Sequence, residues 1–168
     1  VGGLMKGGIE TKQKTSYGTM TNYQTNEVCF WHERMEVEIH IKPTIYVASE
    51  FPQGSCMFNA IMEHEQKHVL VDREIVNKYA SLMGQAIRND MTAHRIYGPV
   101  PLSQQQSLQR QLNARMETLL NNFTNQMSVE RRKRQQAVDS LNEYERINHL
   151  CPEQMKQRKQ HSRKTGNN

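Results

Sequence analysis

Apolar and polar side chains alternate between residues 28 and 48, which is the two-residue period of a β-strand with one buried face. Val37, Ile39 and Ile41 are apolar members of this alternation, and a second apolar run at residues 45–47 follows Pro43. The pattern predicts strands over residues 28–48. Residues 1–15 contain paired glycines and show no period, so we expect them to form a flexible N-terminal arm.

Farther along the chain the apolar period becomes that of a helix. From about residue 55 to about residue 87, one side of a helical wheel collects apolar residues at positions 61, 75, 79, 82 and 86. A turn sequence at residues 52–55 precedes this helix, and Ser55 is its expected N-cap. Residues 97–101 contain Gly98 and two prolines and are expected to be a loop. Residues 103–150 are polar and helix-favouring, which predicts one long helix or two shorter ones.

These elements predict an α+β fold in which a small antiparallel sheet is followed by a central helix and long C-terminal helices. The 168 residues, 36% of them hydrophobic, suit one domain at residues 16–152, followed by a basic disordered tail at residues 153–168. No apolar run approaches the roughly 20 residues needed to span a bilayer. The chain begins at Val1 without a recognisable signal peptide, and we expect a processed or engineered start.

An HExxH motif, formed by His64, Glu65 and His68, lies within the predicted central helix. Residues four apart lie one turn above each other, so both imidazoles can bind one zinc ion with Glu65 beside them as a general base. The histidines fall on the apolar side of the helix, which favours a metal site over the alternative of two histidines packed in a core. Asp72 falls on the same side, and we expect this carboxylate to orient a ligand histidine.

A catalytic zinc site needs a third protein ligand, for which the sequence offers several residues. Glu74 lies six residues past His68, but an unbroken helix points its side chain away from the histidines. We expect His149 to be the third ligand, because antiparallel C-terminal helices would return this segment to the central helix. Glu145, His94 and His40 are the alternatives, although a histidine on a polar helix or strand is more often a surface residue.

A second group of residues, Tyr144, Glu145 and His149, lies near the end of the predicted C-terminal helices. With the HExxH motif, this group makes the chain resemble the bacterial family of predicted secreted zinc-dependent proteases, formerly a domain of unknown function. That family has a strand-rich N-terminal part, an HExxH helix and long helices that end in a motif close to Tyr-Asp-x-x-Thr-x-His-Gly. We take Tyr144 and His149 as its Tyr and His, whereas the chain lacks its Asp, Thr and Gly and has Glu145, Ile147 and Leu150 in this segment instead.

The resemblance covers roughly residues 17–151 and implies a zincin-like metallopeptidase that is secreted or periplasmic and acts on peptides or proteins. It implies that His149 completes the zinc site and that Tyr144 lies near it. In such a site Glu65 would act as general base, and Tyr144 would donate a hydrogen bond to the oxyanion formed during peptide hydrolysis. The alternative for Tyr144 is a helix residue that buries its ring and leaves its hydroxyl in water.

The three cysteines, Cys29, Cys56 and Cys151, do not have the spacing of a metal site. We expect a disulfide between Cys29 and Cys56, which would join the sheet to the central helix in an oxidising compartment. Cys56 with Cys151 is the rival pairing, and three reduced cysteines are a further alternative.

The net charge of +5 is concentrated in residues 131–134 and residues 156–164. We expect the first run to be a solvated helix face, with contact to an anionic surface as an alternative use. Nucleic acid is not the expected partner, because no recognised nucleic-acid fold or aromatic stacking motif surrounds either run. The alternative function is a catalytically silent adaptor of the cell envelope, which keeps the zincin scaffold and binds partners through the basic helical segment.

Overall fold

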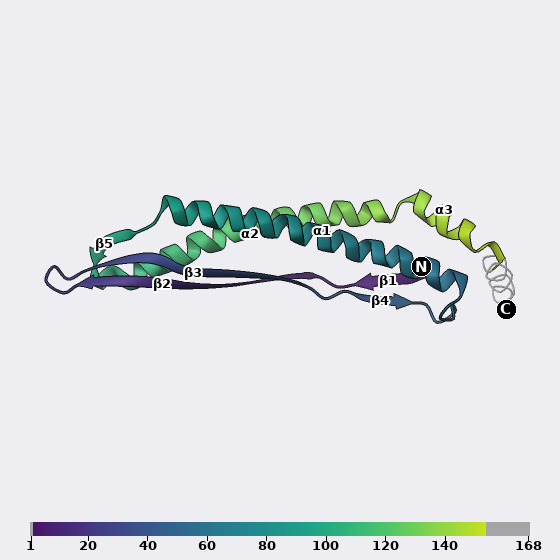
Figure 1. Ribbon diagram of the computed structural model, residues 1–168, viewed down its shortest axis with the longest axis horizontal. Helices are drawn as coiled ribbons and strands as arrows, with labels where there is room; N and C mark the ends of the chain where they lie inside the picture. The colour runs from purple at the N-terminus through teal and green to yellow at the C-terminus, as the bar shows by residue number, and fades with distance from the viewer. Residues whose placement is uncertain (1, 154–168) are drawn as a thin grey trace, which may run out of the picture. The chain divides into compact units, whose positions relative to one another are not determined.

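The computed structural model describes residues 2–153, which form an α+β fold as the sequence predicts. In chain order the elements are β1 (Gly3–Lys6), β2 (Ile9–Asn22), β3 (Glu27–Ile41), β4 (Thr44–Val47), α1 (Cys56–Ala93), β5 (Tyr97–Pro101), a 3₁₀ turn (Leu102–Gln104), α2 (Gln105–Val138) and α3 (Leu141–Leu150) (Figure 1). Of the predicted C-terminal tail, residues 154–168 lie outside the described residues.

The chain divides into two compact units. Of the described residues, unit 1 contains 2–8, 41–74 and 130–153, and unit 2 contains 9–40 and 75–129. Helices α1 and α2 therefore each contribute residues to both units. That residues 16–152 behave as one domain stays a prediction.

Unit 1 contains a two-stranded antiparallel sheet, in which β1 pairs with β4 from Gly3 opposite Val47 onward (Figure 1). The expectation of a flexible arm is therefore wrong for residues 3–6, whose main chain is held by this pairing. Strand β1 also packs closely on α1, because a Cβ atom added at Gly3 would collide with Cγ2 of Ile61. Glycine permits this approach of main chain to helix.

The core of unit 1 lies between the start of α1 and the end of α3. Its buried members are Phe51, Met57, Ala60, Ile61, Ile147 and Cys151. A disulfide between Cys56 and Cys151 joins the first residue of α1 to the residue that follows α3. The expected Cys29–Cys56 pairing is wrong, and Cys29 is a free cysteine on β3.

Unit 2 contains a three-stranded sheet in the order β2, β3, β5. The long strands β2 and β3 run side by side in Figure 1, and β5 pairs antiparallel with β3, with Val28 opposite Val100. Two expectations are corrected here: residues 9–15 belong to β2 rather than to an arm, and residues 97–101 form β5 rather than a loop. Val28 and Phe30 of β3 and Leu112 of α2 form a buried cluster in this unit.

The helix starts that matter for the site have side-chain caps. The Ser55 hydroxyl accepts a hydrogen bond of 3.2 Å from the Phe58 amide, as predicted for the N-cap of α1. The predicted C-terminal helical segment forms two helices, because the chain leaves helical geometry after Val138 and α3 starts from a new cap at Ser140. The Ser140 hydroxyl accepts a hydrogen bond from the Glu143 amide.

Candidate metal centre

His64 and His68 lie one turn apart on α1, and both are buried, with 5% and 8% of their surface exposed. Their ring centroids are 5.0 Å apart and their planes are nearly perpendicular. Both rings line a cavity of about 480 Å³ within unit 1. The structure therefore confirms the predicted helix and the predicted burial of its two histidines.

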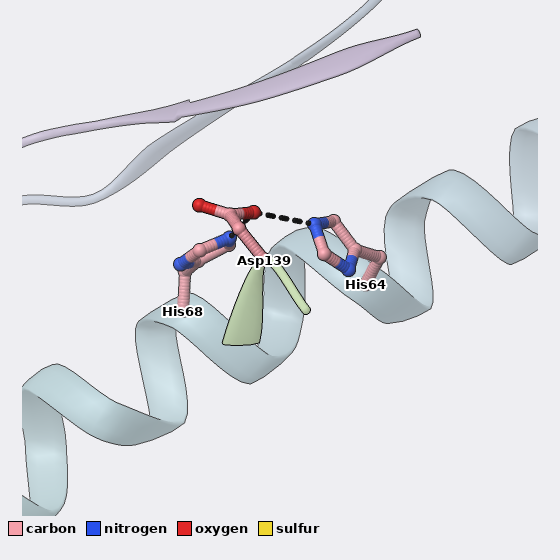
Figure 2. A group of neighbouring side chains, drawn as sticks. All are labelled: His64, His68 and Asp139. Atoms are coloured by element: carbon pink, nitrogen blue, oxygen red, sulfur yellow. Dashed lines mark hydrogen bonds and ion pairs between the residues drawn. The ribbon is translucent and has the colours of Figure 1, made fainter. Parts of the chain in front are cut away.

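Asp139 completes the group from the break between α2 and α3. Figure 2 shows its carboxylate reaching toward both imidazoles, with one oxygen directed at the two rings. The Oδ1 atom of Asp139 lies 3.2 Å from Nε2 of His64 and 3.2 Å from Nε2 of His68. Among residues 2–153, these three side chains form the group able to bind a metal ion, with one ligand atom from each within 4.8 Å of the others.

The donor atoms of this group are ones that bind zinc and other divalent metal ions. Ligand atoms about 2.0–2.2 Å from one tetrahedral ion lie about 3.3–3.6 Å from each other, close to the two nitrogen–oxygen distances observed. Two imidazoles and one carboxylate are typical catalytic zinc ligands, and they leave a fourth position for water or substrate. The Asp139 side chain is 46% exposed, so the group is open to solvent on that side.

A hydrogen-bond network assigns the protonation of His68. The side-chain amide of Gln135 donates bonds of 3.0 Å to the His68 carbonyl oxygen and 2.7 Å to Oδ1 of Asp72, which places its Oε1 against Nδ1 of His68. Since Oε1 can only accept, Nδ1 carries the proton, and a neutral His68 has an unprotonated Nε2. That lone pair faces a carboxylate oxygen of Asp139 at 3.2 Å, an arrangement that a metal cation between the two atoms, or a second proton on His68, would stabilise.

Asp72 is 2% exposed and lies behind Gln135 rather than against a histidine. Arg131 holds its carboxylate with two hydrogen bonds, from Nε to Oδ1 at 2.7 Å and from Nη2 to Oδ2 at 2.9 Å. The hydrogen bond to Asp72 is the main cause that raises the pKa of Arg131, so the guanidinium stays charged. Asp72 therefore acts on His68 indirectly, through Gln135, rather than by the direct contact with a histidine that we expected from the sequence.

His64 has a carboxylate near its other nitrogen. Its buried Nδ1 has no hydrogen-bond partner among the described residues but lies 3.5 Å from Oε1 of Glu143, in the first turn of α3. Hydrogen bonds from Arg146 and, more weakly, from Lys67 lower the pKa of Glu143 to about 2, although burial opposes them. Glu143 is thus an anion at neutral pH beside the imidazole, suited to support its binding of a metal.

Glu65 and Tyr144 line the same cavity as the three candidate ligands. Glu65 is 5% exposed and lies under β1, since a Cβ atom added at Gly3 would come within 2.6 Å of its Oε1. The Tyr144 ring lies 5.9 Å from the His64 ring. Burial raises the pKa of the Tyr144 hydroxyl, and the nearby Asp139 and Glu65 carboxylates raise it further, so the hydroxyl keeps its proton.

The structure does not place His149 in the candidate metal group. It is exposed near the end of α3, and Glu145 on the same helix is exposed as well. His40 pairs with Glu38, His94 stacks on Tyr97, and Glu74 pairs with Arg134. The geometry therefore favours Asp139 over His149 and its alternatives as the third ligand.

The sequence interpretation missed Asp139, Gln135 and Glu143. The capping pattern Ser140-x-x-Glu143 was a visible signal, since it marks a new helix start and places Asp139 at the break before it. The spacing of the second motif was also misread, because His149 lies five residues after Tyr144 whereas the family motif separates its Tyr and His by six.

The basic run at residues 131–134 is only partly available as a binding surface. Arg131 pairs with Asp72 and Arg134 with Glu74, while Arg132 and Lys133 are exposed. Two of the four charges are therefore engaged within unit 1.

A comparison of the chain with protein-family models, with curated proteins and with solved structures found no match. The resemblance to the zinc-dependent protease family stays a prediction that depends on the HExxH motif. Within residues 2–153, no helix combines the length and the apolar character needed to cross a membrane.

Proposed function

We propose that the chain is a zinc-dependent metallopeptidase whose metal ligands are His64, His68 and Asp139. The observation that carries the proposal is the approach of two atoms that both bind metals, since Nε2 of His68 lies 3.2 Å from Oδ1 of Asp139. A metal cation satisfies both atoms, and Glu65 of the same HExxH helix lines the cavity beside them. The alternative is a doubly protonated His68 that donates a hydrogen bond to Asp139. The metal content of the purified protein distinguishes this alternative from a metal site.

A bound zinc ion would supply a Lewis acid that polarises the scissile carbonyl and lowers the pKa of water. The protein's own residues would then transfer the proton of the attacking water and stabilise the negative charge of the oxyanion. Glu65 takes the proton of the attacking water and passes it to the leaving amine. Tyr144 keeps its proton and donates a hydrogen bond to the oxyanion.

A peptide substrate is supported by the strand beside the site. Residues 2–5 line the cavity, and β1 has β4 as its single strand neighbour within the described part of the chain. The other edge of β1 is where an extended peptide would add by main-chain hydrogen bonds. The Cys56–Cys151 disulfide favours an oxidising compartment, so we propose a secreted or periplasmic location.

The test is the metal content of the purified chain, measured by elemental mass spectrometry for the unmodified protein and three variants. We expect near-stoichiometric zinc in the unmodified chain and in His149→Ala, and loss of zinc in His68→Ala and Asp139→Ala. No zinc after reconstitution would contradict the proposal. Loss in His149→Ala with retention in Asp139→Ala would restore His149 as the ligand.

Activity then separates an enzyme from an adaptor. Glu65→Gln should keep its zinc and lose peptide hydrolysis, because it removes the proton acceptor and no ligand. The adaptor function would be supported if Glu65→Gln leaves the biological function intact while charge reversal at the exposed Arg132 and Lys133 abolishes it.

A further inference from the structure

We propose that the cavity beside the metal group contains a specificity pocket for a large apolar side chain of the substrate, at the residue next to the scissile bond. This inference rests on the proposed function and names the substrate class of the same site. The cavity of about 480 Å³ has two chemically different ends. One carries the candidate ligands, Glu65, Arg131 and Tyr144, and the other is formed by Gly2, Phe51, Met57, Ile61 and Ile147.

The apolar end lies one helical turn from the general base. Met57, Ile61 and Glu65 follow each other at intervals of four residues on α1, so they form a row along one side of the helix. The rise along α1 from Ile61 to Glu65 is about 6 Å. An extended peptide advances about 3.3 Å per residue, so a substrate cleaved beside Glu65 places a flanking side chain within reach of Ile61.

Strand β1 connects the two ends of the cavity. A Cβ atom at Gly3 would collide with the side chain of Ile61 and would also come within 2.6 Å of Oε1 of Glu65. The main chain of this strand therefore touches both the apolar row and the base. A peptide that adds to β1 would carry alternate side chains toward α1, one of them over Ile61.

The proposed pocket would favour apolar substrate side chains because a charged side chain would lose its hydrating water there. Phe51, Met57, Ile61 and Ile147 are all less than 9% exposed and belong to the buried core of unit 1. Among the charged residues that line the cavity, Glu65 is the one beside the apolar row, so no cationic side chain is placed there to pair with a substrate carboxylate. A carboxylate group entering there would lose its hydration without gaining a partner.

The experiment uses the zinc-loaded full chain and a peptide library whose cleavage sites are identified by mass spectrometry. We expect Leu, Met or Phe next to the cleaved bond, with kcat/KM at least about tenfold higher than for matched peptides with Asp or Glu there. Ile147→Ala should shift the preference toward larger side chains such as Phe and Trp. Ile96→Ala, at an exposed residue of unit 2, is the matched control and should leave the preference unchanged.

Each outcome decides the proposal. Cleavage by the zinc-loaded chain without an apolar preference overturns the pocket and leaves the proposed peptidase standing. Bound zinc with no cleavage of any library peptide overturns both. If Ile147→Ala fails to fold, as judged by circular dichroism, the preference of the unmodified chain still decides, because an apolar pocket without a cationic partner must disfavour Asp and Glu.

Discussion

Replacing Gln135 with Leu should weaken zinc binding without removing a ligand. The substitution deletes the acceptor for Nδ1 of His68 and the two bonds that the amide donates, 3.0 Å to the His68 carbonyl and 2.7 Å to Asp72. Without that acceptor the proton is no longer fixed on Nδ1, and Nε2 must lose a proton before it can bind metal. Loss of such a supporting contact costs about 10–100-fold in metal affinity, or about 1.4–2.7 kcal/mol.

The assay is a competition titration against a chromophoric zinc chelator at neutral pH. Gln136→Leu is the matched control, since Gln136 has the same side chain, neighbours Gln135 on α2 and is exposed. A thermal melt of both metal-free variants measures the accompanying loss of stability, which we expect to be about 1–3 kcal/mol for Gln135→Leu because Asp72 and the His68 carbonyl each lose a partner. Equal zinc affinity in the two variants would refute the assigned role of Gln135.

Three further outcomes are expected. Tyr144→Phe should keep its zinc and lower kcat by about 10²–10³-fold, the range for loss of an oxyanion donor, and unchanged kcat in a steady-state peptide assay would exclude this role. Cys151→Ser should lower the free energy of unfolding by about 2–5 kcal/mol in denaturant titrations, because the Cys56–Cys151 bond closes a sequence separation of 95 residues, whereas Cys29→Ser should change it little. Glu143→Gln should lower the free energy of unfolding above pH 4.5. The difference in this free energy between the variant and the unmodified chain should shrink as pH falls toward about 2, since the folded-state pKa of Glu143 lies below its ordinary value. A difference in unfolding free energy that does not change with pH would contradict this.

The parts of the fold that follow local rules could be predicted from the sequence. The period of α1, its Ser55 cap and the burial of His64 and His68 all depend on residues within a few turns of one another. Strand β1 could not be found this way, because a strand of four residues is too short to show an alternation of apolar and polar side chains. Its conformation depends instead on pairing with β4, about forty residues away in the sequence. β5 was missed because its glycine and prolines resemble a loop until β3 supplies the partner.

The third ligand was missed for a related reason. The sequence defines which residue types can bind zinc, but the return of a distant segment to α1 depends on where the C-terminal helices break. Asp139 lies 71 residues after His68, and its position follows from the end of α2 at Val138 and the new cap at Ser140. Residue type and helical period alone favoured His149, which α3 leaves exposed.

Helix α3 links the metal group to the proposed specificity pocket. Its first turn places Glu143 near His64, Tyr144 lines the cavity, and Ile147, one turn after Glu143, packs in the apolar core. The helix is fixed at its start by the Ser140 cap and at its end by the disulfide from Cys151 to the start of α1. A ten-residue helix is marginal in isolation, so its position depends on these attachments. Reduction of the disulfide should therefore displace both Tyr144, the proposed hydrogen-bond donor to the oxyanion, and Ile147, which lines the proposed pocket. The positions of His64 and His68 should change less, because both lie on α1.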